Sequence, residues 1–390
     1  MHNAQRLPTR GTRLPHTTYH PRPLTMVIAL IALCILASYL FLRSIQSFAS
    51  PTENCANLLR QADYQQILAA TTEQQLPPVT QITSDLIPGQ LSTFVQVSHP
   101  DDPRHLLDVY VYTCSQQGRD SQPTLIPVFQ LHDLIQGTAS ITHAHSLSIG
   151  QLDTTLPVDN DLLMQPDQQT MYREYRWQNG AFIQVPFPAL FPVLSRAEAQ
   201  QLQAQANAGT ILPWTDPLKT AASLAQNLLH WSADSTHIHL VHQSASEAEL
   251  TLTEESPSCE LDVTLQRLIQ TDEHGLWFVT SASSPGLTLQ HNNLDMATSS
   301  PLTLSGTLDQ AGAPAAHQST PTALLFDHTL THLAVLNTEA ITIQSNGGFT
   351  GTLHFTNDLP GQPSLLLLAF TTSSAGQQTT RLLLTNVLLS

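Results

Sequence analysis

Four histidines near the middle of the chain have a spacing that could hold a metal ion: His230, His237, His239 and His242. Side chains alternate between the two faces of a strand, so His237 and His239 share a face if this stretch is extended. Imidazole nitrogens bind Zn²⁺ and Cu²⁺, and two to four of these rings would supply the ligands. The alternative is that histidine serves here as an uncharged polar strand residue. No cysteine or carboxylate completes a familiar ligand set, so we assign no cofactor.

The four cysteines are the next candidates for chemistry. Cys34 lies in an apolar stretch, whereas Cys55, Cys114 and Cys259 follow that stretch. A disulfide between Cys55 and Cys114 would tie an expected helix to an expected strand. It competes with the alternative of three buried free thiols, because spacing alone does not establish geometry. The sequence has no CxxC pair, which argues against a thiol–disulfide active site and against a zinc ribbon.

Common catalytic signatures are absent from the sequence. It contains no GxSxG nucleophile elbow, no HExxH motif, no phosphate-binding P-loop and no GxGxxG motif. Several aromatic residues could line a small pocket beside an acid, but we expect these rings to form the core. They are Tyr172, Tyr175, Trp177, Trp214, Trp231 and Trp277. We therefore predict a protein that is not an enzyme, and an enzyme built in an α+β pocket is the alternative.

An apolar segment between Arg22 and Arg43 determines the expected topology. Residues 23–42 carry no charge, and a helix of this length spans about 30 Å, the thickness of a bilayer's hydrocarbon core. Four arginines precede the segment and one follows it, which places a disordered tail, residues 1–22, in the cytoplasm. We predict a single-pass anchor in the cell membrane over residues 23–43, with the later domains extracytoplasmic. The alternative is secretion after cleavage near Ala49.

Charge is unevenly distributed along the chain. Residues 1–49 carry five arginines and no acid, whereas residues 50–390 carry nine basic residues and all thirty acids, a net charge of −21. Such an acidic domain repels the phosphate backbone of nucleic acids and the headgroups of anionic lipids. Nucleic acid is therefore excluded as a partner.

Residues 50–194 are expected to form a β-rich α+β domain. Apolar residues recur at helical spacing over residues 55–70, and the period then shortens to two. Asn179 and Gly180 separate alternating runs at 172–177 and 181–185, which is the strongest short-range signal for a hairpin. Further strands are expected at residues 91–97, 106–113, 124–131 and 139–149.

Residues 195–284 are expected to form a helix packed across an antiparallel sheet. Ser195 and Glu198 form a capping box for a helix that stops at Gly209. Asp216 and Pro217 begin a second helix, expected to run to about residue 231. Strands are expected at residues 237–241, 248–253, 260–269 and 276–281. A helix followed by such a meander is typical of an α+β module of cystatin-like type.

Residues 285–390 contain seven short strand patterns and no helix pattern, which favours an immunoglobulin-like β-sandwich. Three stretches, at 300–307, 349–355 and 380–389, resemble the immunoglobulin-like domain of bacterial spore-germination and related envelope proteins. The first reads Ser-Pro-Leu-Thr-Leu-Ser-Gly-Thr, the second Phe-Thr-Gly-Thr-Leu-His-Phe and the third Thr-Arg-Leu-Leu-Leu-Thr-Asn-Val-Leu-Leu. The resemblance implies a non-catalytic extracytoplasmic module, and the insertion-like residues 311–320 depart from the family pattern. The rest of the chain resembles uncharacterised exported bacterial proteins.

The expected fold class is therefore α+β: one N-terminal transmembrane helix, β-rich modules outside the membrane, and a C-terminal sandwich. The expected function is that of a non-enzymatic binding or structural module of the bacterial cell envelope, with an envelope protein as its partner. The alternative from another class is a small-molecule or metal-binding module that uses the histidines at 230–242.

Overall fold

The computed structural model describes residues 35, 51–72, 79–116, 122–155, 170–290, 297–309, 319–330, 332–336, 338, 341–355, 359–374 and 377–389. The predicted tail and membrane segment lie outside these residues, apart from Ile35. Within the described ranges, no helix has both the length and the apolar character needed to cross a membrane. Strands dominate and helices are the minority, which confirms a β-rich α+β fold.

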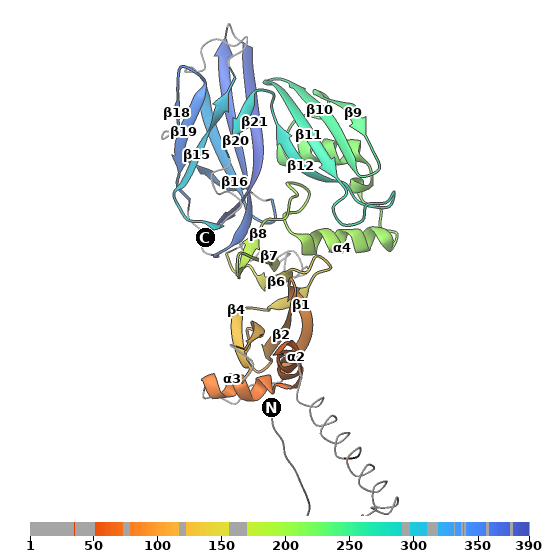
Figure 1. The fold of residues 1–390 in the computed structure, drawn as a ribbon. Helices are drawn as coiled ribbons and strands as arrows, with labels where there is room; N and C mark the ends of the chain where they lie inside the picture. The colour runs from red at the N-terminus through yellow and green to blue at the C-terminus, as the bar shows by residue number, and fades with distance from the viewer. Residues whose placement is uncertain are drawn as a thin grey trace, which may run out of the picture.

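The described chain begins with two helices packed on a four-stranded antiparallel sheet (Figure 1). The single helix predicted over residues 55–70 is in fact two helices. The Asp63 carboxylate accepts a hydrogen bond from the backbone N–H of Gln66 and so starts the second one. The elements are α2 (Pro51–Gln61), α3 (Tyr64–Thr72), β1 (Val79–Ile87), β2 (Gln90–His99), β3 (Leu106–Ser115) and β4 (Thr124–Leu134).

A second four-stranded sheet contains β5 (Thr138–Ile141), β6 (Leu147–Leu152), β7 (Thr170–Gln178) and β8 (Ala181–Val185). The predicted hairpin of β7 and β8 is confirmed, and Asn179 and Gly180 adopt left-handed φ angles of 52° and 88°. The single strand predicted over residues 139–149 is wrong. Thr142 and Ser146 close a turn there through backbone and hydroxyl hydrogen bonds, so that β5 and β6 form a hairpin.

The interior between these two sheets is apolar. Phe94 and Val109 of the first sheet pack in one cluster with Ile149 and Tyr175 of the second. The ring of Phe129 bridges the sheets, with its centroid 5.0 Å from that of Tyr175. On its other face, the first sheet packs against the helices. The central strand β3 is therefore covered on both faces, which explains why it is buried almost throughout.

Two helical regions follow β8. Helix α4 (Arg196–Asn207) starts at the predicted capping box: Ser195 Oγ accepts the backbone N–H of Glu198 at 3.2 Å and donates to its carboxylate at 2.6 Å. After the 3₁₀ turn η3 (Pro213–Thr215), helix α5 (Pro217–Ser223) starts at Asp216 as predicted. It ends earlier than predicted, because the chain continues as the π-helical turn η4 (Leu224–Leu228).

Helix α5 and η4 pack across one face of an antiparallel meander. Leu224 and Leu228 of η4 join Leu250, Val263 and Trp277 in the largest core of the described chain. The four strands of the meander are β9 (Thr236–Gln243), β10 (Glu247–Glu255), β11 (Ser258–Gln266) and β12 (Phe278–Ser283).

The C-terminal strands form a sandwich of two sheets around an apolar core that includes Leu304, Phe349 and Phe370. One sheet contains β13 (Leu287–Leu289), β15 (Leu302–Leu308), β18 (Thr342–Ile343) and β19 (Gly348–Leu353). The other contains β14 (Ala297–Thr298), β16 (Thr320–Phe326), β17 (His332–Leu336), β20 (Gln362–Ser374) and β21 (Gln377–Leu389).

The second of these sheets is continuous with the β9–β12 meander. Strand β21 pairs antiparallel with β12 at Ala282–Leu384 and Ser283–Leu383, and parallel with β11 at Ser258–Thr379. Together the strands make one nine-stranded sheet. Hydrogen-bonded pairing therefore crosses the position, between residues 284 and 285, where the sequence analysis divided two domains.

Replacing Gly180 with alanine is expected to lower the free energy of unfolding by about 1–2 kcal/mol, because an L-residue is strained at a φ of 88°. A Cβ at this position would meet no atom within 4 Å, so the cost is conformational and not steric. Urea titration measures it. The matched variant, Asn179→Gly, relieves a φ of 52° in the same turn and is expected to be neutral or stabilising. Equal losses in both variants would contradict this explanation.

Candidate functional site

The predicted metal ligands lie on the solvent side of an edge strand. His237, His239 and His242 of β9 stand opposite Thr253, Thr251 and Glu249 of β10. An irregularity in the pairing between Leu240 and His242 adds one residue, Val241, to β9, so all three histidines reach the outer face of the sheet. All three are exposed.

The fourth predicted ligand, His230, is exposed at the end of the helical region and has a left-handed φ of 56°. Of these four imidazoles, that of His237 lies beside a carboxylate: its Nε2 is 3.2 Å from Glu255. Across the described residues, no three His, Cys, Asp or Glu side chains are grouped so that they could hold a metal ion. The structure thus leaves the four histidines exposed and does not gather them into one site.

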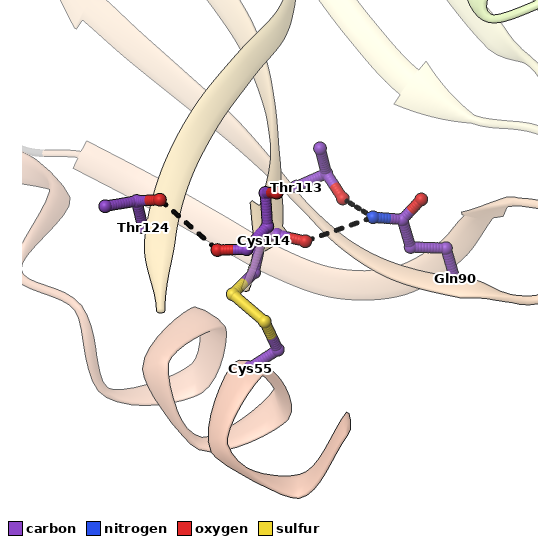
Figure 2. The surroundings of a disulfide bond; sticks show 6 residues. Cys55, Gln90, Thr113, Cys114 and Thr124 are labelled. Atoms are coloured by element: carbon purple, nitrogen blue, oxygen red, sulfur yellow. Dashed lines mark hydrogen bonds between the residues drawn. A yellow bond between two sulfur atoms is a disulfide. The ribbon is translucent and has the colours of Figure 1, made fainter. Parts of the chain in front are cut away.

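The structure joins Cys55 of α2 to Cys114 of β3 in a disulfide, with 5.5 Å between their Cα atoms (Figure 2). Hydrogen bonds hold the end of β3 beside it: the Gln90 amide donates to the Cys114 carbonyl at 3.3 Å, and Thr124 Oγ1 donates to the neighbouring Ser115 carbonyl at 3.2 Å. Cys259 is a buried free thiol. Burial raises its pKa to about 11, so it is not a reactive thiolate at neutral pH.

A histidine and acid cluster that the sequence analysis missed lies on β2, β3 and β4. The Asp108 carboxylate lies 3.0 Å from His99 Nε2 and 3.7 Å from His132 Nδ1. Tyr110 Oη lies 3.3 Å from the same nitrogen of His132. Burial, assisted by the charge of Asp108, raises the pKa of Tyr110 to about 12, so the phenol stays protonated at neutral pH. Strand periodicity places Asp108 beside Tyr110, but only strand pairing brings the two histidines to them.

A second group of charged residues is buried where β5–β8 meets the rest of the chain. Glu174 of β7 is 6% exposed and accepts hydrogen bonds from Arg196 Nε at 2.9 Å and from Ser146 Oγ at 2.6 Å. Arg173 donates to the carbonyl of Pro360 at 3.0 Å, and Gln184 donates to that of Gly361 at 2.5 Å. These contacts connect β7 and β8 to the helix α4 and to the sandwich.

The most deeply buried pair of this group is Asp153 and His328, whose side chains are 0% and 2% exposed. His328 Nε2 lies 3.1 Å from Asp153 Oδ2, and Thr155 donates to the other carboxylate oxygen through its backbone N–H and its hydroxyl. Burial raises the pKa of Asp153, but the hydrogen bonds from His328 and Thr155 outweigh it, so this pKa lies below its ordinary value. The carboxylate is therefore ionised at neutral pH. The pair links the end of β6 to the turn after β16.

Four of the six aromatic residues predicted to form the core lie in or against the described core clusters, whereas Tyr172 and Trp177 are half-buried and belong to none of these clusters. Tyr175 lies between the first two sheets, and Trp277 is 1% exposed in the core under α5. Trp214 and Trp231 are partly buried against that same core.

A cleft of about 330 Å³ opens where β12 and β21 separate. Residues 186–190 form a third wall, and Asn386 attaches them to β21 by donating to the carbonyls of Phe187 and Ala189 at 2.8 and 2.9 Å. The lining side chains include hydroxyls, an amide, leucines and prolines, and none of them is charged.

The polar residues at the β5–β8 junction and those of the cleft have different roles. The buried charged side chains at the β5–β8 junction form hydrogen bonds and hold parts of the fold together. The cleft offers uncharged hydrogen-bonding groups beside apolar ones, which is suited to binding. Comparison with models of protein families gives no match, and neither does comparison with curated proteins.

Proposed function

We propose that this protein is a single-pass, membrane-anchored protein of the bacterial cell envelope that acts outside the cytoplasm as a non-enzymatic binding or structural module. Residues 23–43 serve as the anchor, and residues 1–22 stay in the cytoplasm. The β9–β12 meander with α5 is a cystatin-like module, and the C-terminal sandwich is immunoglobulin-like. The partner is another envelope protein.

The observation that carries this proposal is that buried charged side chains hold separate parts of the fold together. Glu174, Arg173 and Asp153 each contact a residue far away in the sequence: Arg196, Pro360 and His328 respectively. Such contacts cost desolvation and are retained where they specify one arrangement of the parts. A chain that holds its sheets in one arrangement is suited to presenting a surface to a partner.

The disulfide supports the location. Disulfides persist in oxidising compartments and are rare in the cytosol. Cys55 lies twelve residues beyond Arg43, just past the proposed anchor, so the first domain outside the membrane would be stabilised where its cysteines become oxidised.

Site-specific crosslinking in the host's own membranes tests the proposal. A photoreactive residue replaces an exposed apolar side chain: Ile211 at 96% exposure, Val335 at 67% or Val241 at 58%. Mass spectrometry then identifies what co-purifies with the tagged full chain. We expect one envelope protein, captured reproducibly from at least one position and not from the matched control, in which the buried Leu250 is replaced. Saturable turnover of an envelope substrate by the purified chain would overturn the non-enzymatic role.

A further inference from the structure

The cleft between β12 and β21 results from the way in which the nine-stranded sheet is joined. The two strands pair at only two positions, Ala282–Leu384 and Ser283–Leu383, and then separate. Beyond them, Leu190 and Phe191 bond to the backbone of Val279, so residues 186–191 replace β21 as the neighbour of β12. The space left between the strands is about 330 Å³, within the range of about 300–1,000 Å³ typical of small-molecule sites.

The lining of the cleft selects against charge. The polar lining residues are Thr280, Ser281, Ser283, Thr385 and Asn386, and no ionisable side chain is among the lining residues. A charged ligand would lose its hydration here without meeting a counter-charge. The ligand that fits this lining is therefore neutral.

Polar and apolar groups both line the cleft, which favours a ring with both characters. Ser281 and Pro188 are exposed, and Leu289 and Thr385 are half-buried, so hydroxyl and hydrocarbon surfaces are both accessible. Asn386 uses its amide N–H groups within the protein, whereas its Oδ1 is buried and accepts no hydrogen bond there. The Asn386 side chain therefore holds a wall of the cleft in place, and the accessible hydrogen-bonding groups are the hydroxyls.

We propose that this cleft is a binding site for a neutral carbohydrate. A sugar ring supplies hydroxyl donors and acceptors for Ser281, Ser283 and Thr385, and its C–H faces pack on Leu289 and Pro188. The inference gives a ligand class to the binding role proposed above and rests on that role. A failed sugar experiment leaves the protein crosslinking result unchanged, so the two proposals fail separately.

Saturation-transfer NMR on the full chain in detergent tests the site with four sugars of the same ring size. N-acetylglucosamine and glucose are neutral, glucosamine is cationic and glucuronate is anionic. We expect saturable signals from at least one neutral sugar, and affinity about tenfold or more weaker for both charged ones. If the tetramer of N-acetylglucosamine gives a stronger signal than the monomer, the natural ligand is a sugar unit within a glycan. Equal signals identify a free sugar.

Two variants place a large side chain in the cleft from opposite walls: Ser281→Trp on β12 and Thr385→Trp on β21. Each is expected to weaken sugar binding about tenfold or more. The matched control, Thr303→Trp, lies on the exposed face of β15 and is expected to leave binding unchanged. The proposal is overturned if neither neutral sugar binds, if charged sugars bind as tightly, or if the two folded cleft variants bind like the wild type. Binding of an uncharged tripeptide but of no sugar would also overturn it.

Discussion

Replacing His328 with alanine is expected to lower the free energy of unfolding by about 3–5 kcal/mol, because it leaves the buried carboxylate of Asp153 without its principal partner. Asp153 is fully buried, so water does not take the place of the imidazole. Thr155 still donates two hydrogen bonds, which is why the expected loss stays within this range. Urea titration followed by tryptophan fluorescence measures the effect.

The loss of unfolding free energy in His328→Ala is expected to become smaller as the pH falls. The pKa of Asp153 is lower in the folded chain than its ordinary value, so the folded state favours the ionised form. Stability from this source is fully present above about pH 4, the pKa of an unfolded aspartate, and disappears as the pH falls through the lowered pKa of the folded state. The difference between wild type and His328→Ala is therefore expected to shrink below about pH 4. A difference that grows on acidification would contradict this assignment.

A matched control and a double variant isolate the pair. His237→Ala removes an imidazole that also contacts a carboxylate, but both members of that pair are exposed, at 66% and 70%. It is expected to change stability by less than about 1 kcal/mol. The double variant Asp153→Ala/His328→Ala removes the unpaired charge, so its loss is expected to be smaller than the sum of the single losses. Additive losses would show that the two residues act independently.

Replacing both Cys55 and Cys114 with serine is expected to destabilise the first domain by about 4 kcal/mol, because the disulfide closes a long loop, with a sequence separation of 59. The bridge restricts the unfolded chain, and the restriction grows with the length of the loop. It also holds α2 on the sheet, where Leu59 of α2 is buried in one cluster with Val95 and Val97. Thermal unfolding followed by circular dichroism measures the change.

Reduction provides the control for the disulfide. Dithiothreitol is expected to lower the unfolding temperature of the wild type to that of the double variant and to leave the variant unchanged. Cys259→Ala is the matched cysteine variant: this thiol is free and buried, so the variant should retain the full response to reductant. If reductant has no effect on the wild type, the disulfide does not stabilise the domain.

Local signals in the sequence predicted most of the elements correctly. Hairpin β7–β8, the capping box at Ser195 and the start of α5 at Asp216 each depend on residues within a few positions of one another. The errors also have local causes. Strand β1 is rich in Thr, Gln and Ser and half-exposed, so it lacks the apolar alternation that identifies a strand. In residues 139–149, the alternation continues through the turn that separates β5 from β6.

The sequence by itself determined the β-rich α+β class, the acidic character of residues 50–390 and the positions of most turns, because composition and short-range periodicity are properties of neighbouring residues. Tertiary structure alone decided which side chains meet. Asp153 and His328 are 175 positions apart, and the cleft joins residues 186–190 to β12 and β21. Conversely, the closely spaced His237, His239 and His242 remain on an open surface. Proximity in the chain sets the face of a strand, but strand pairing and sheet packing set what lies opposite that face.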